Sequence, residues 1–307
     1  MTDPVHRYRL FGLSVSSEIA LPELVSDAGD GAVDVRIGLG TIASRPDAPA
    51  GLHVEGDETL LVVPPVGRFL ARAGREMVVQ PADGVSPRNL RLFLLGSAFA
   101  SILYQRGLLP LHANAVVVEG RAIGFMGHSG AGKSTLAAWF HDHGFDVLAD
   151  DVCVVGAGPD GPPLAYPGIP RLRLWREALE AGGRDASAYE RSFDDMDKYT
   201  VPTDLERTFP AVPLSHLYLL EKAEGEPSIV RLEGSAAVEA MIANTYRGAY
   251  VRPMGLTRQH LLACAELART VPVYRARRRW GYESFDSQGA ALEAHARELI
   301  LKAEAAE

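Results

Sequence analysis

The sequence predicts an α/β fold in which a phosphate-binding loop (P-loop) core follows a small N-terminal β-rich domain. Three observations predict it. Short β-branched or alternating apolar runs occupy the chain up to about residue 84. From residue 111 the pattern becomes strand, glycine-rich loop, helix and strand. The loop itself has the spacing G-x-x-x-x-G-K-S. We therefore expect a β-rich domain at residues 1–84 and a P-loop domain at residues 85–307.

Composition excludes several classes of protein. The net charge of −8 argues against sequence-independent nucleic-acid binding, which needs clustered cations. Two cysteines are too few for a disulfide scaffold or a Cys-rich zinc module. The first residues lack the apolar stretch of a signal peptide, and the longest apolar stretch, Leu92–Tyr104, is shorter than the about 20 residues that span a bilayer. We expect a cytoplasmic protein with no nucleic-acid or membrane partner; its oligomeric state, including a homo-oligomer, is left open.

The N-terminal domain is expected to consist of short strands without a catalytic constellation. These strands are Arg7–Leu13, Val33–Leu39, Thr59–Val63 and Met77–Gln80. Ser86 followed by Pro87 then provides a helix N-cap and a proline at the first helical position. The helix that begins there should reach about Gln105.

The P-loop domain should begin with strands at 113–118 and 122–126 and a helix from Lys133 to His143, which Gly144 ends. A strand at Asp146–Val155, interrupted by two acids, is expected next. The polar, glycine-containing stretch from about 180 to 204 is expected to be mobile. The remaining expected elements are strands at 214–220 and 272–277 and helices at 235–243, 258–270 and 288–303.

The P-loop residues have a chemical reason for their spacing. Glycines let backbone N–H groups turn inward as an anion nest, and the following helix directs its positive dipole end at the same point. Lys133 can reach the β- and γ-phosphates, and the Ser134 hydroxyl can ligate Mg²⁺. We therefore expect ATP and Mg²⁺ as cofactors. The residues expected to bind the nucleotide are Gly127, Ser129, Gly130, Ala131, Gly132, Lys133, Ser134 and Thr135.

Motifs that are absent narrow the class of P-loop protein. The chain has no D-x-x-G followed by N-K-x-D or T-K-x-D, which argues against a guanine-specific switch protein. It has no L-S-G-G-Q, which argues against a transporter-type ATPase. The H-R-D-x-x-x-x-N and D-F-G pair of eukaryotic-type protein kinases is also missing.

Two adjacent carboxylates, Asp150 and Asp151, end the strand that follows the P-loop helix. This is where an acid that holds Mg²⁺ is expected. Neighbouring residues of a strand point to opposite faces, so the two acids should have different functions. One can lie at the metal while the other faces an acceptor hydroxyl as general base. His112 lies at the start of the strand before the loop, where a histidine is by itself more often a structural hydrogen-bonding residue.

Together these segments resemble the core of HPr kinase/phosphorylase, a bacterial serine kinase with a fold related to phosphoenolpyruvate carboxykinase. The resemblance covers about residues 108–156 and joins Leu111-His112-Ala113, the P-loop and Ala149-Asp150-Asp151. It implies an α/β P-loop core of HPr kinase/phosphoenolpyruvate-carboxykinase type.

The resemblance also implies the functions of the site residues. Asp151 would be the proton acceptor for the substrate serine, and His112 a supporting catalytic residue. Lys133 would bind the phosphates, Ser134 would bind Mg²⁺, and Asp150 would lie beside the metal. One departure is that Pro167–Trp175 contains no carboxylate where the family has a second Mg²⁺-ligating Glu. The reverse, phosphorolytic reaction is therefore left open.

Softer motifs resemble a narrower group: HPr-kinase-related enzymes that phosphorylate the C-terminal serine of lasso-peptide precursors. These motifs are Tyr8–Leu13, Ser17–Leu24, Pro167–Trp175 and Asp197-Lys198-Tyr199. The resemblance implies an ATP-dependent serine kinase whose partner is a peptide or small protein with an acceptor serine. Alternatives kept open are an HPr-type protein kinase, a small-molecule kinase and a non-catalytic ATP-binding regulator.

A C-terminal serine presents a carboxylate beside the reacting hydroxyl. Guanidinium groups bind carboxylates in a bidentate way, so basic residues are the expected acceptor ligands. The candidates are Arg171, Arg173, Lys198, Arg247 and Arg252. The polar segment around Lys198 is expected to close over the site and exclude water. The run of arginines from Arg275 to Arg279 is expected to be a solvated late strand.

Overall fold

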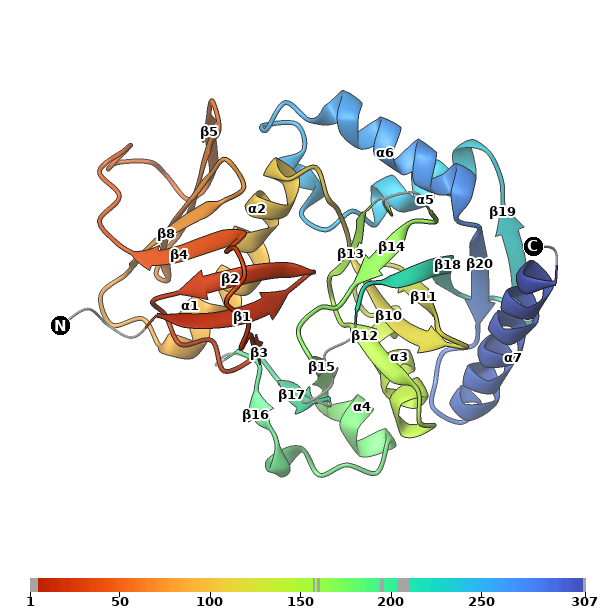
Figure 1. The fold of residues 1–307 in the computed structure, drawn as a ribbon. Helices are drawn as coiled ribbons and strands as arrows, with labels where there is room; N and C mark the ends of the chain where they lie inside the picture. The colour runs from red at the N-terminus through yellow and green to blue at the C-terminus, as the bar shows by residue number, and fades with distance from the viewer. Residues whose placement is uncertain (1–4, 157, 159–160, 194–195, 204–209, 306–307) are drawn as a thin grey trace.

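The computed structural model describes residues 5–156, 158, 161–193, 196–203 and 210–305. It is a mixed α/β structure with a β-rich N-terminal region (Figure 1). In this part of the chain the strands form three sheets, and two of them are large. Within the described residues, none of the helices has both the length and the apolar character that a bilayer span requires.

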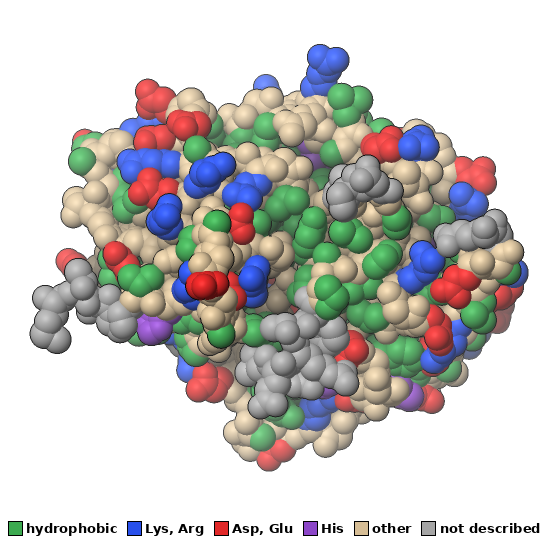
Figure 2. Space-filling model, viewed as in Figure 1, with side chains coloured by type: hydrophobic (Ala, Val, Ile, Leu, Met, Phe, Trp, Pro, Cys, Tyr) green, Lys and Arg blue, Asp and Glu red, His purple; other side chains and the backbone are tan. Residues whose placement is uncertain are grey.

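The N-terminal region is a mixed eight-stranded sheet, coloured red to orange in Figure 1. Its strands are β1 (His6–Leu10), β2 (Leu13–Ser17), β3 (Val25–Ser26), β4 (Val35–Leu39), β5 (Gly51–Glu55), β6 (Glu58–Val63), β7 (Gly67–Arg72) and β8 (Glu76–Pro81). Their order across the sheet is β3-β1-β2-β4-β8-β7-β6-β5. Figure 2 shows acidic and basic side chains interspersed over this sheet on the viewed face.

The single strand expected at Arg7–Leu13 is instead a hairpin of β1 and β2. The chain reverses at Phe11 and Gly12, which both have positive φ. Gly12 adopts this conformation without a steric cost, so the reversal falls inside the apolar run.

The helical segment after the sheet begins as predicted. The Ser86 Oγ accepts a hydrogen bond from the Asn89 N–H at 3.2 Å, and Pro87 stands in the first turn. The segment runs through α1 (Pro87–Phe93), a π-helical turn η1 (Leu94–Ala98) and α2 (Phe99–Gln105).

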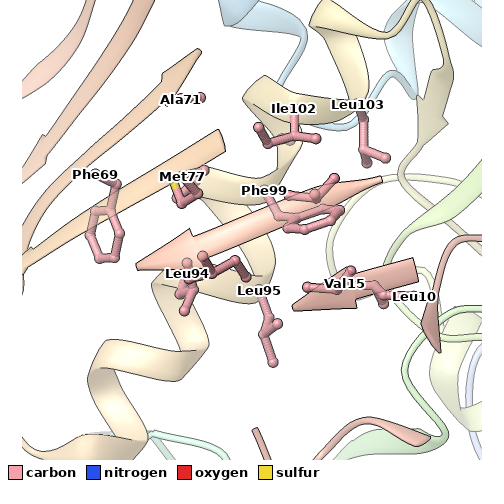
Figure 3. Packing of buried hydrophobic residues seen from close by; sticks show 14 of the residues in the cluster. Leu10, Val15, Phe69, Ala71, Met77, Leu94, Leu95, Phe99, Ile102 and Leu103 are labelled. Atoms are coloured by element: carbon pink, nitrogen blue, oxygen red, sulfur yellow. The ribbon is translucent and has the colours of Figure 1, made fainter. Parts of the chain in front are cut away.

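This helical segment covers the N-terminal sheet. Phe99, Ile102 and Leu103 of these helices belong to the same apolar cluster as Phe69 and Met77 of the sheet (Figure 3). Burial of such side chains is the main stabilising contribution in a domain of this size. The apolar core therefore crosses the expected boundary at residue 84, and the division into 1–84 and 85–307 stays a prediction.

The second large sheet has the order β12-β10-β11-β18-β14-β13-β9, with β20 paired to β18 and β19 to β20. Its strands are β9 (Leu109–Leu111), β10 (Ala113–Val118), β11 (Arg121–Met126), β12 (Asp146–Ala149), β13 (Cys153–Gly156), β14 (Leu164–Tyr166), β18 (Val212–Lys222), β19 (Ser228–Leu232) and β20 (Val273–Arg278). The strand, loop, helix and strand order predicted around the P-loop is confirmed.

Helices cover both faces of this sheet (Figure 1). The helices are α3 (Lys133–Asp142), α5 (Ser235–Ala243), α6 (Thr257–Thr270) and α7 (Phe285–Glu304). Apolar residues of α3 and α7 form one buried cluster with the sheet, and those of α5 and α6 form another. The short turn η3 (Gly248–Tyr250) lies between α5 and α6. The late strands and helices predicted from the sequence are confirmed within a few residues.

One predicted strand is wrong in a way that matters for the site. The expected strand at Asp146–Val155 is divided into β12 and β13. Asp151 has φ +72°, in the left-handed region, so the strand cannot continue through it. β12 pairs with β10, whereas β13 pairs with β9 and β14. The two acids therefore lie in the connection between strands.

The stretch from 180 to 204, expected to be mobile, contains regular structure. A small sheet of β15 (Arg171–Trp175), β17 (Lys198–Pro202) and β16 (Glu190–Arg191) runs beside α4 (Arg176–Ala181) and η2 (Ala186–Ala188). Tyr199 and Val201 alternate with more exposed neighbours, as in a half-buried strand. Lys198–Pro202 is thus a regular strand of this sheet, and the expectation that the stretch is mobile stays a prediction. Residues 194–195 and 204 lie outside the described residues.

The apolar cluster of the N-terminal sheet gives a test of stability. We predict that Phe99→Ala, at a fully buried ring, lowers the free energy of unfolding by about 3–5 kcal/mol through lost burial and a cavity. Urea unfolding followed by circular dichroism measures this. Leu261→Ala, at a half-exposed position of α6, should change it by less than about 0.5 kcal/mol. Equal effects of the two substitutions would contradict the packing.

Candidate functional site

The P-loop connects β11 to α3, and its glycines are required by its backbone. Gly127, Gly130 and Gly132 have φ of +147°, +85° and +81°. L-residues rarely adopt such angles. A Cβ at Gly132 would lie 2.4 Å from Arg278 Nη2, and one at Gly127 would lie 2.9 Å from a backbone oxygen. The loop is therefore fixed in its turn by conformation and by close packing.

Lys133 is buried at the first position of α3. Its ammonium donates hydrogen bonds to the backbone oxygens of Gly127 at 2.7 Å and His128 at 3.2 Å. It also lies 3.2 Å from His112 Nε2. Burial lowers the pKa of Lys133 from its ordinary value. The ammonium is held across the loop where phosphates would bind.

His112 connects Lys133 to Asp151 through its two ring nitrogens. Because an ammonium donates to Nε2, the ring proton is assigned to Nδ1, which lies 3.0 Å from the Asp151 carbonyl oxygen. Burial, and then the charge of Lys133, lowers the pKa of His112. The neutral imidazole thus positions the backbone of the second acid.

Asp150 is held by three hydrogen-bond donors. Its Oδ1 accepts from the Ser134 hydroxyl at 2.9 Å and from the Asn114 amide, and its Oδ2 accepts from the Arg173 N–H at 2.7 Å. The contact with Ser134 brings together the two oxygen donors predicted for Mg²⁺. Asn114 was missed by the sequence reasoning, although an amide in an otherwise apolar strand is the signal that could have found it.

Asp151 has different partners. Its carboxylate pairs with the Arg173 guanidinium, and its Oδ1 lies 3.5 Å from His112 Nδ1. Burial by itself raises the pKa of Asp151, but the charge of Arg173, together with those of Lys198 and Lys133, outweighs burial and lowers it. Asp151 is therefore an ionised carboxylate at neutral pH.

Two cavities meet at this carboxylate. The first, here the P-loop cavity, has a volume of about 650 Å³ and is lined by Ser129–Thr135, the end of β15 and residues 278–285. The second, here the inner cavity, has a volume of about 560 Å³ and lies between the N-terminal helices and the 245–250 turn. His112, Asp151 and Arg173 line both. The two cavities are therefore adjacent, and the Asp151 side chain is part of the lining of both.

The acceptor candidates are distributed between the cavities. Arg171, Arg173 and Arg247 line the inner cavity, whereas Lys198 lines the P-loop cavity, with its ammonium 5.8 Å from the Trp175 ring. Arg252 is exposed and lines neither cavity.

Arg171 differs from the other arginines of the inner cavity in its lack of partners. Within the described residues its side chain has no hydrogen bond and no ion pair, and burial lowers its pKa to about 10. Such a guanidinium is free to pair with an anion of a ligand.

Two further residues of the site were not predicted. Arg278, expected in a solvated strand, is 5% exposed, and its Nη2 donates to the Ala131 carbonyl oxygen at 2.6 Å. Asn244 accepts a hydrogen bond from the Gly127 N–H at 2.8 Å, and its carbonyl oxygen accepts one from the His112 N–H at 2.6 Å. Arg278 faces inward because alternate positions of β20 are buried, which the basic run conceals in the sequence.

The donor set fits a magnesium–nucleotide complex. In the described part of the chain, no cluster of three or more His, Cys, Asp or Glu side chains can hold a metal. Mg²⁺ is typically bound through one or two protein oxygens together with substrate phosphates and water. Ser134 and Asp150 fit that pattern, and the glycine turn leaves room for phosphates beside them.

Comparison with known proteins gives a limited result. No protein-family model matches the chain, and no curated protein matches it. Among solved structures, the chain is similar to the HPr(Ser) kinase/phosphatase from Coxiella burnetii, with a TM-score of 0.35 and 13% sequence identity. The match covers 64% of this chain and 98% of that one.

The contact of the P-loop with Arg278 predicts a difference between two glycines. Gly130→Ala and Gly132→Ala both force alanine into the left-handed region, which costs about 1–2 kcal/mol. Only the Cβ at Gly132 meets Arg278, whereas that at Gly130 meets open space. We predict that Gly132→Ala lowers the free energy of unfolding by more than Gly130→Ala does, as measured by urea unfolding.

A double-mutant cycle tests the cause of that difference. In an Arg278→Ala background the extra cost of Gly132→Ala should disappear, because the clashing side chain is gone. A difference that survives in this background would mean that another contact is responsible.

Proposed function

We propose that the protein is an ATP-dependent serine kinase with a core of HPr kinase/phosphoenolpyruvate-carboxykinase type. The observation that carries the proposal is that two cavities meet at Asp151, His112 and Arg173, one of them lined by a complete P-loop. A kinase needs this arrangement, because the γ-phosphate and the acceptor hydroxyl approach from different sides. Phosphoryl transfer depends mostly on positioning and charge stabilisation.

In this proposal the chain's own residues stabilise charge on the phosphates. The loop N–H groups and the Lys133 ammonium face the transferred group, where negative charge is spread over its oxygens. Ser134 and Asp150 would hold Mg²⁺, which supplies further positive charge to the phosphates. His112 holds the Lys133 ammonium with one ring nitrogen and the Asp151 backbone with the other, and so fixes their relative positions.

Asp151 is the general base of the proposed reaction. The acceptor oxygen forms a bond to the γ-phosphorus, the bond from that phosphorus to the β–γ bridging oxygen breaks, and ADP leaves. The hydroxyl proton goes to the Asp151 carboxylate. Arg173 keeps this carboxylate ionised before the substrate arrives, because its charge lowers the pKa.

The inner cavity supports an acceptor with a carboxylate beside its hydroxyl. It combines the unpartnered Arg171 with Arg247, whose guanidinium lies 5.4 Å from the Tyr246 ring, and with apolar side chains from the N-terminal helices. A C-terminal serine fits both features, with its carboxylate on the arginines and its hydroxyl toward Asp151. We therefore propose the C-terminal serine of a ribosomal peptide precursor, of the lasso type, as the acceptor.

A small-molecule kinase is the second candidate. The inner cavity, of about 560 Å³, lies in the size range typical of small-ligand pockets, about 300–1,000 Å³. Screening of hydroxy acids and peptides with labelled ATP separates the two candidates. The cytoplasmic location and the lack of nucleic-acid and membrane partners stay predictions.

The assignment of the base gives a direct prediction. Asp151→Asn should reduce phosphate transfer from labelled ATP to a serine-ending peptide by about 10²–10⁴-fold, because the proton acceptor is lost. Lys133→Ala should reduce it by orders of magnitude as well. Circular dichroism should show that both variants are folded. Near-wild-type transfer by folded Asp151→Asn would remove the base assignment.

The assignment of the acceptor predicts a difference in KM. Arg171→Met should raise KM at least about tenfold for a peptide with a free C-terminal carboxylate, because a charged hydrogen bond is lost. KM for the amidated peptide should stay unchanged. Arg252→Met is the matched control and should behave as wild type with both peptides. An equal effect of Arg171→Met on the two peptides would contradict a carboxylate at Arg171.

A further inference from the structure

One side of the P-loop cavity is lined by residues to which the proposed phosphate transfer gives no function. It is formed by the segment from Arg278 to Phe285 (the 278–285 segment), which joins the end of β20 to the start of α7. Trp280 and Tyr282 of this segment line the cavity and are nearly half exposed. These large aromatic side chains face the cavity that the P-loop also lines. They offer a flat apolar surface to a ligand bound there.

Arg278 supplies a second, independent observation. Its guanidinium is buried beside Gly132, yet within the described residues it has no carboxylate partner, and its Nε has no hydrogen-bond acceptor. Burying a cation without an anion is costly, and burial lowers the pKa of Arg278 to about 10. Because this group lines the cavity beside the phosphate loop, an anionic ligand provides the missing countercharge.

The indole of Trp280 is held in place from the protein side. The Lys222 ammonium lies 5.4 Å from its ring centroid, and the His128 ring meets it edge-on at 5.7 Å. A ring fixed in this way loses little conformational entropy when a ligand stacks on it.

The direction of the nucleotide follows from the position of Asp151. Arg173 and His112 contact this carboxylate, whereas Arg278 contacts the Ala131 carbonyl oxygen of the P-loop. A nucleotide whose γ-phosphate lies at Asp151 therefore places its other end against a different part of the cavity lining. The 278–285 segment supplies aromatic side chains to that lining, separate from the contacts of Asp151.

We propose that the 278–285 segment binds the nucleoside end of a purine nucleoside triphosphate, with the base stacked on Trp280 and the Arg278 guanidinium directed at the phosphates. This inference rests on the proposed function, because it takes the P-loop cavity as a nucleotide site. Stacking of a base on an aromatic side chain is worth about 1–3 kcal/mol.

The test compares two ligands that differ in the nucleoside. Calorimetry with the full chain measures the affinity for MgATP and for inorganic triphosphate. Trp280→Ala should weaken ATP binding by about tenfold, which corresponds to about 1.4 kcal/mol, and leave triphosphate binding unchanged. Trp175→Ala is the matched control, because Trp175 and Trp280 both line this cavity and are both 46% exposed. It should leave both affinities unchanged. Arg278→Met should weaken both ligands.

Fluorescence gives a readout that does not depend on the affinity of a variant. The chain has three tryptophans, so ATP should quench emission in the wild type and in Trp175→Phe but not in Trp280→Phe. Inorganic triphosphate should quench none of them.

If ATP binds Trp280→Ala as tightly as wild type, or if Trp175→Ala instead weakens ATP binding, the stacking of the purine on Trp280 is overturned. The nucleotide site itself would still stand. Failure of the wild type to bind either ligand would overturn the proposed function as well.

Discussion

The arrangement of the site depends on the backbone reversal at Asp151. Its left-handed conformation ends the strand and separates two neighbouring carboxylates, although they are adjacent in the sequence. Asp150 is thereby directed to the Ser134 hydroxyl on α3, and Asp151 to His112 and Arg173. The two carboxylates therefore have separate sets of donors and face different parts of the site.

The local charge around the two cavities is opposite in sign to the net charge of the chain. The chain has a net charge of −8, yet cations without carboxylate partners gather around the P-loop and the inner cavity. Arg278, which is buried, and Arg171, which is half-buried, are the clearest cases among the described residues, since neither has an ion pair. A folded chain keeps such groups only where their cost is offset, and an anionic ligand offsets it when bound. In the proposed function, the phosphates of the nucleotide and the carboxylate of the acceptor would supply these negative charges.

The candidate site was predicted in part from the sequence because part of it is local. The P-loop, the start of α3 and the two acids follow from short motifs that lie within one strand, loop, helix and strand unit, and Ser134 contacts Asp150 only 16 positions away. The resemblance to a known family implied that His112 belongs to the site, and the structure puts its Nε2 3.2 Å from the Lys133 ammonium. Arg278 and Asn244 were missed, because strands and helices from the other end of the chain bring them to the loop. The strand at Lys198–Pro202 was missed because its polar neighbours concealed the alternation.

The sequence by itself determined the order of strand, loop, helix and strand and the residue types of the phosphate cradle. Glycine spacing and apolar periodicity act through nearest neighbours along the chain, and this is why they can be read without coordinates. Only the tertiary structure decided that the N-terminal helices close an inner cavity over Asp151, and that Arg278 is buried against the loop. Those contacts join residues that are distant in the sequence, 147 positions apart for Arg278 and Ala131, and packing rather than local preference selects them.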